Sequence, residues 1–104
     1  MKGLKKYGKL VRDNIPDIMM AKGQVSVTHF ATPEEYAAKL DEKLLEEATE
    51  FFESRDPEEL ADILEVVYAL AATRGITKEN LEALRKKKAE ERGGFEKHII
   101  LDEA

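Results

Sequence analysis

The stretch LEEATEFFESRDPEELADILEV, residues 45–66, places acidic residues among the apolar residues that form helix faces. It contains two similar motifs, EEATE at residues 46–50 and EELAD at residues 58–62. The pair Asp56-Pro57 between them is typical of a helix start. Because a short connection favours antiparallel neighbours, the stretch predicts two facing helices whose acids meet near one turn.

Helix start and stop signals divide the rest of the chain. Thr32 and Pro33, with an acid at position 35, predict a capping box. Glycines at 23, 75 and 93–94 are typical of helix ends. The predicted helices cover residues 16–22, residues 33–54, residues 57–74, and a segment opened by Thr77 that ends near Arg92. Residues 24–30 and 95–101 are expected to be short strands or extended arms.

Composition limits the class of protein. The 104 residues suit one domain, residues 1–104, and the 42% hydrophobic and 38% charged content favours a soluble helical protein. The net charge of −5 argues against nonspecific nucleic-acid binding, and the absence of cysteine excludes thiolate chemistry. No apolar run is long enough to span a bilayer, and the first residues lack the pattern of a signal peptide. We therefore expect no membrane association and a cytoplasmic location.

One acid of the first motif lies within an apolar stripe. The stripe consists of Tyr36, Leu40, Leu44, Glu47 and Phe51, at intervals of three or four residues. Glu47 therefore occupies a position where an apolar residue is expected. Glu50 follows three residues later on the same edge of the helix.

The second long helix is apolar on nearly every side. Residues 60–72 have the sequence LADILEVVYALAA, in which the charged residues are Asp62 and Glu65. A helix of this kind is usually buried, so both acids are expected to lie inside the structure. Glu59 lies one turn before Asp62 on the same face.

Several buried carboxylates side by side require compensation. A divalent cation provides it, and oxygen ligands from two facing helices suit Mg²⁺ or Mn²⁺. The predicted metal ligands are Glu47, Glu50, Glu59 and Asp62. Buried salt bridges are the alternative.

Other acids of the stretch have simpler interpretations. Glu59 could serve only as the third-position acid of a cap at Asp56. Glu46, Glu53 and Glu58 fall on the expected outer face and would then be solvated.

Residues 44–70 resemble the all-α nucleoside triphosphate pyrophosphohydrolases, the MazG-like enzymes. The signature of that family is EExxE followed by ExxD, here EEATE at 46–50 and ELAD at 59–62. YGKLVRDNIP at 7–16 resembles the "YxKLVRDxIP" motif of a phosphoribosyl-ATP pyrophosphohydrolase-like subgroup. Lys88 with RGGF at 92–95 resembles its C-terminal motif. The resemblance covers nearly the whole chain.

The resemblance implies a reaction and a set of roles. The family's metal ligands correspond to Glu47, Glu50, Glu59 and Asp62, the same four acids that the helical faces indicate. The implied reaction is hydrolysis between the α- and β-phosphates of a nucleotide, which gives a monophosphate and pyrophosphate, with a house-cleaning role. Glu46 would either support the ligands, help to activate water, or remain a solvent group.

Basic residues near both ends of the chain are candidates for binding the substrate phosphates. The family motifs favour Lys9, Arg12, Lys88 and Arg92. The alternative is that they are solvated charges, or charges that favour a helix C-terminus. There is no GxxxxGK[ST] motif, so the phosphates are not expected to be held by a P-loop.

Three functions remain open on the sequence. They are a Mg²⁺-dependent nucleotide pyrophosphohydrolase, a phosphoribosyl-ATP pyrophosphohydrolase of histidine biosynthesis, and a non-catalytic metal-binding helical dimer. The expected fold is an all-α helical bundle completed by oligomerisation, with short extended N- and C-terminal segments. A monomer of this size cannot cover the apolar surface of residues 60–72, so we expect at least a homodimer. The resemblance implies a dimer or a dimer of dimers.

Overall fold

The computed structural model describes residues 4–104, and in that range it contains four α-helices and no strands. The helices are α1 (Ile15–Ala21), α2 (Pro33–Ser54), α3 (Pro57–Thr73) and α4 (Lys78–Arg92). The all-helical prediction is confirmed for these residues. The chain forms two compact units, Met1–Leu70 and Ala71–Ala104, and the division falls within α3.

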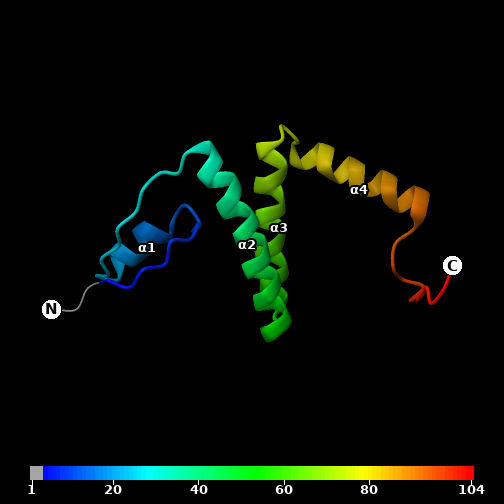
Figure 1. Ribbon diagram of the computed structural model, residues 1–104, viewed down its shortest axis with the longest axis horizontal. Coiled ribbons are helices and arrows are strands. Elements are labelled where there is room, and N and C mark those ends of the chain that lie inside the picture. The colour runs from blue at the N-terminus through cyan, green and yellow to red at the C-terminus, as the bar shows by residue number, and fades with distance from the viewer. Residues whose placement is uncertain (1–3) are drawn as a thin grey trace. The chain divides into compact units, whose positions relative to one another are not determined.

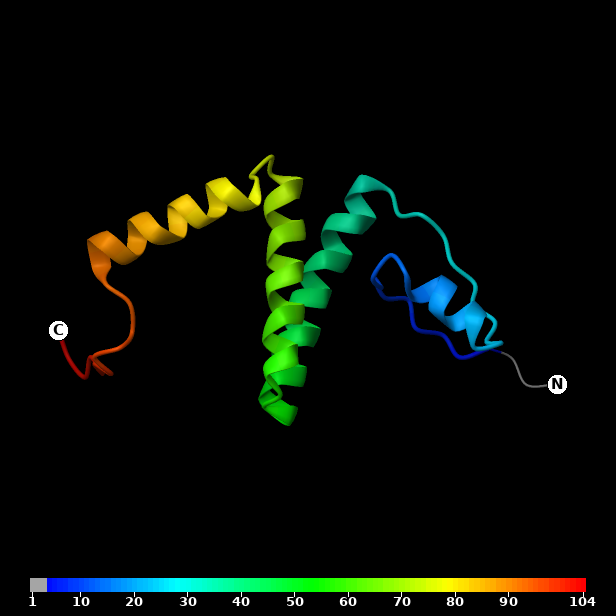
Figure 2. The ribbon, with the colours of Figure 1, turned by 180° about the vertical axis from the view of Figure 1, so that it is seen from behind.

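The first unit is built on the pair formed by α2 and α3. Figures 1 and 2 show these helices side by side and running in opposite directions. The reversal takes two residues, because Arg55 adopts a left-handed conformation with φ of 58° and ends α2. The carboxylate of Asp56 then accepts a hydrogen bond from the backbone N–H of Glu58 and starts α3. The predicted antiparallel arrangement is therefore present.

Local signals define the helix ends closely. The Thr32 hydroxyl accepts a hydrogen bond from the backbone N–H of Glu35, which begins α2 as predicted. The second half of the predicted capping box is replaced, because the Glu35 carboxylate lies 2.8 Å from the His29 ring. Thr77 caps α4 through the N–H of Asn80 in the same way, and Gly75 with φ of 72° follows α3. Each observed helix boundary lies within one or two residues of its prediction.

The buried part of the first unit is small. Leu40 of α2 is 1% exposed and Val66 of α3 is 7% exposed. The prediction that α3 is buried on nearly every side is wrong for this chain alone, since Leu60 and Leu64 are about half exposed. Glu65, expected to lie inside, is also exposed. Within this unit α3 lies beside α2 (Figure 1), and this contact leaves Leu60, Leu64 and Glu65 exposed.

Neither segment that could have formed a strand does so. Residues 24–30 have no regular structure, and a strand needs a neighbouring strand to pair its backbone groups. The C-terminal segment begins with a turn, in which the N–H of His98 donates to the carbonyl of Phe95. The expectation of an extended segment from residue 95 onward is therefore wrong at its start.

The second unit contains α4, which has no buried residue. Gly93, with φ of 84°, follows its last residue, Arg92, where the sequence predicted the stop. In the part of the chain that the structure describes, no helix is long and apolar enough to cross a membrane.

Candidate metal centre

Acidic side chains from α2 and α3 meet in one cluster in the first unit. Glu46, Glu47 and Glu50 form one group, and Glu47, Glu59 and Asp62 form another. Within each group, one carboxylate oxygen of every member lies within 4.8 Å of the others. The structure thus brings all four predicted ligands together, as two overlapping groups that share Glu47.

Glu47 is the most confined member of the cluster. It is 6% exposed and is the only buried charged residue among the described residues. Its Oε1 lies 3.1 Å from the ammonium of Lys43, whereas its Oε2 is buried and has no hydrogen-bond partner within residues 4–104. Burial, together with the charges of Glu50 and Asp62, raises the pKa of Glu47 despite the opposing effect of Lys43. An unpartnered buried carboxylate oxygen is costly, and this atom is available to a cation.

Glu59 shows the same under-compensation on the facing helix. It is half-buried, and its Oε2 also lacks a partner among the described residues. Loss of solvation, followed by the charges of Glu50, Asp62 and Glu47, raises the pKa of Glu59 to about 7. The backbone N–H of Asp56 donates to the Ser54 hydroxyl, so the carboxylate of Glu59 is not occupied as the second half of a capping box. The structure favours the cluster over the capping interpretation of this residue.

Glu46 has a different environment from its neighbour. Lys9 Nζ lies 3.1 Å from Oε1, and Lys43 Nζ lies 3.3 Å from Oε2. Although loss of solvation opposes the effect, these two lysines lower the pKa of Glu46. The expectation of a solvated outer residue is wrong, because Glu46 is half-buried and paired. Both of its oxygens are used by lysines, which agrees with its absence from the predicted ligand set. The expected positions of Glu53 and Glu58 on the surface are confirmed.

The N-terminal segment contributes cations to the same cluster. Arg12 Nη2 lies 2.7 Å from Asp62 Oδ1, and Lys9 reaches Glu46 on the other helix. These contacts join residues that are 50 and 37 positions apart in the sequence. Two of the four predicted phosphate-binding residues therefore contact the cluster: Arg12 contacts a predicted metal ligand, and Lys9 contacts Glu46.

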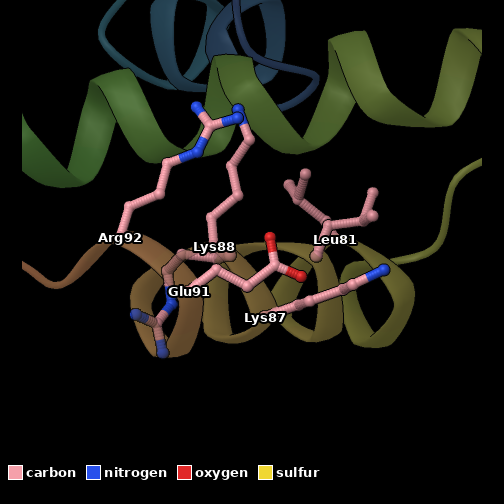
Figure 3. A pocket seen from close by; sticks show the side chains of 7 residues that line it. Leu81, Lys87, Lys88, Glu91 and Arg92 are labelled. Atoms are coloured by element: carbon pink, nitrogen blue, oxygen red, sulfur yellow. The ribbon is translucent and has the colours of Figure 1, made fainter.

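The other two lie in the second unit. Figure 3 shows the side chains of Lys88 and Arg92 extending from the same side of α4. They line a shallow groove along that helix, together with Leu81, Leu84, Arg85, Lys87 and Glu91. The role of Lys88 and Arg92 in substrate binding stays a prediction.

Lys43 belongs to the site, although no motif of the sequence predicted it. Its side chain is 17% exposed and contacts both Glu46 and Glu47. The available signal was its position four residues before Glu47, a spacing at which helical side chains meet. A lysine in a chain with 17 basic residues did not stand out.

The donor set fits a hard divalent cation. Every member of the cluster offers carboxylate oxygens, which Mg²⁺ and Mn²⁺ prefer. Two buried oxygens, Oε2 of Glu47 and Oε2 of Glu59, have no partner in the part of the chain that the structure describes. Comparison with protein-family models, curated proteins and solved structures gave no match. The resemblance to the all-α pyrophosphohydrolases therefore rests on the sequence motifs alone.

Proposed function

We propose that this protein binds a divalent cation between α2 and α3 and hydrolyses a nucleotide to a monophosphate and pyrophosphate. The observation that carries the metal site is the buried, unpartnered Oε2 of Glu47. It lies in a cluster whose members come from both helices, so acids from one solvated helix face do not account for it.

Glu47, Glu50, Glu59 and Asp62 would hold the cation, which we expect to be Mg²⁺ or Mn²⁺. When bound, such an ion neutralises phosphate charge and makes a coordinated water more acidic. This chemistry requires no protein nucleophile, which agrees with a chain that contains no cysteine.

The cations beside the cluster support a phosphate-bearing substrate. The guanidinium of Arg12 and the ammonium of Lys9 are each about half exposed, so a ligand can reach them. Guanidinium and ammonium groups form strong charge-assisted hydrogen bonds with phosphate oxygens. We propose that these two side chains orient the phosphates next to the cation. The family motif assigns Lys88 and Arg92 to the same task.

The bond that is cleaved is proposed from the family resemblance, which implies attack between the α- and β-phosphates. A phosphoribosyl-ATP pyrophosphohydrolase would perform the same chemistry on a different nucleotide. The contacts of Arg12 and Lys9 concern phosphates and do not distinguish these substrates.

We also propose that the active form contains at least two copies of the chain. Leu45 and Phe52 on α2, and Leu60 and Leu64 on α3, are between 47% and 71% exposed. Large apolar side chains gathered on one helix pair are typical of an interface. A second copy packed on this surface would complete the bundle around a two-fold axis.

A titration with Mn²⁺ tests the metal site directly. We expect saturable binding to the wild-type protein and much weaker binding to Glu47→Gln, which keeps the shape of the side chain and removes its charge. Glu53→Gln, an exposed acid of α2, is the matched control and should bind like wild type. Absence of binding to the wild-type protein would rule out both the enzyme and the metal-binding dimer.

A further inference from the structure

Lys43 is unusually buried for a lysine. Its side chain is 17% exposed, although ammonium groups are strongly hydrated and lysines are mostly exposed. Its Nζ lies 3.1 Å from Glu47 Oε1 and 3.3 Å from Glu46 Oε2. The ammonium therefore joins two adjacent carboxylates of α2, both members of the cluster.

These contacts make the two oxygens of Glu47 unequal. Oε1 is bound to Lys43, whereas Oε2 is buried and has no partner among the described residues. A carboxylate is planar, so a contact that holds one oxygen also restricts the direction of the other. Oε2 is thus the oxygen that remains for a cation.

We propose that Lys43 is a positioning residue, an inference that rests on the proposed metal site. Its ammonium holds Glu47 through Oε1 and so presents Oε2 to the divalent cation. Lys43 itself contacts neither the cation nor the substrate. Groups that hydrogen-bond to metal ligands often orient them in this way.

A competing interpretation predicts the opposite effect. If Lys43 were only a counter-ion, its positive charge would repel a divalent cation nearby. Its removal would then strengthen metal binding. The positioning role predicts weaker binding, so the sign of the change separates the two interpretations.

The test is Mn²⁺ affinity at fixed pH, measured by calorimetry on the full chain. We expect Lys43→Met to weaken binding by about 10–100-fold, the range found when partners of metal ligands are removed. Lys39→Met is the matched control on the same helix, because Lys39 pairs with Glu42 rather than with the cluster. It should leave the affinity unchanged.

Two further variants and one spectrum complete the test. Lys43→Arg keeps the charge and a donor, and should restore most of the affinity. Lys43→Leu is likewise neutral and has no donor, so it carries the same test if the methionine variant does not fold. The electron paramagnetic resonance spectrum of bound Mn²⁺ should change in Lys43→Met, because the Glu47 carboxylate is no longer held in place.

The outcomes are distinguishable. Equal or tighter binding by the neutral Lys43 variants would overturn the positioning role and leave the metal site intact. No Mn²⁺ binding by the wild-type protein would instead overturn the proposed function.

Discussion

The cluster between α2 and α3 and the helix α4 both contain many charges, but they pair them differently. On α4, Arg85 binds Glu82 three residues away through two nitrogens. The hydrogen bond from Arg85 lowers the pKa of Glu82. In the cluster, the nearby cations do not balance the negative charge around Glu47 and Glu59. The pKa of each of these two carboxyl groups is therefore raised.

This difference shows which charged residues of a chain point to a functional site. An acid with a local partner on an exposed helix is a common surface feature that contributes little to stability. An acid destabilises the fold when it is buried, lacks a partner and lies close to acids of another helix. Such an acid is a candidate functional residue.

The acids of the cluster should be indispensable for catalysis. Glu47→Ala and Asp62→Ala should reduce metal-dependent nucleotide hydrolysis below detection, whereas Glu53→Ala should retain it. Because removal of Glu47 also removes an unpartnered buried carboxylate, we do not expect it to unfold the helices. Activity assays with circular dichroism on the same samples measure both effects. Similar activity in all three variants would show that the cluster is not the site.

The exposed leucines of α3 should control assembly. Leu64→Asp places a charge on the proposed interface and should reduce the mass measured by light scattering to that of a monomer. Leu84→Asp is the matched control, because it changes an exposed leucine on α4, and it should leave the mass unchanged. A wild-type monomer at micromolar concentration with full activity would contradict the proposed assembly.

Arg12 should matter more than Arg85 for substrate binding. Arg12→Ala removes a charge beside Asp62, and we expect kcat/KM to fall roughly tenfold, which corresponds to about 1.4 kcal/mol. Arg85→Ala removes a guanidinium already bound by Glu82 and should have little effect. Steady-state kinetics on both variants provides the comparison. The reverse order of effects would place the phosphate contacts elsewhere.

A smaller effect is expected on the pH dependence of thermal stability. The pKa of Glu59 is about 7 in the folded chain, compared with an ordinary value of 4.5, so folding favours its protonated form. Its contribution to stability is therefore full below about pH 4.5 and is lost as pH rises through about 7. With a chelator present, the melting temperature should rise between pH 8 and pH 6, and Glu59→Gln should reduce that rise. An identical pH dependence in both proteins would argue against the raised pKa.

The sequence predicted those features that depend on nearby residues. Thr32 and Gly75 act within one turn of their own positions, so the ends of α2 and α3 could be placed without tertiary information. The spacing of Glu47 from the apolar residues of its helix, and of Asp62 from Glu59, likewise predicted the helix face on which each acid lies. Glu65 was misplaced because apolar composition does not state how many sides of a helix are covered.

Contacts between distant segments were not available from periodicity. The pairing of Arg12 with Asp62 depends on how the N-terminal segment lies against α3, which no local pattern encodes. The alternative that made Glu46 a solvent group failed for a related reason. Its environment depends on Lys9, 37 positions away, as well as on Lys43.

The identity of the reaction product is the decisive test of the proposed hydrolysis. The wild-type protein should be incubated with a panel of nucleoside triphosphates and phosphoribosyl-ATP, with Mg²⁺ or with a chelator, and the products separated by ³¹P NMR. We expect pyrophosphate and a monophosphate from at least one of these nucleotides, with Mg²⁺ and not with the chelator. Orthophosphate as the first product, or hydrolysis that persists with the chelator, would contradict the proposal.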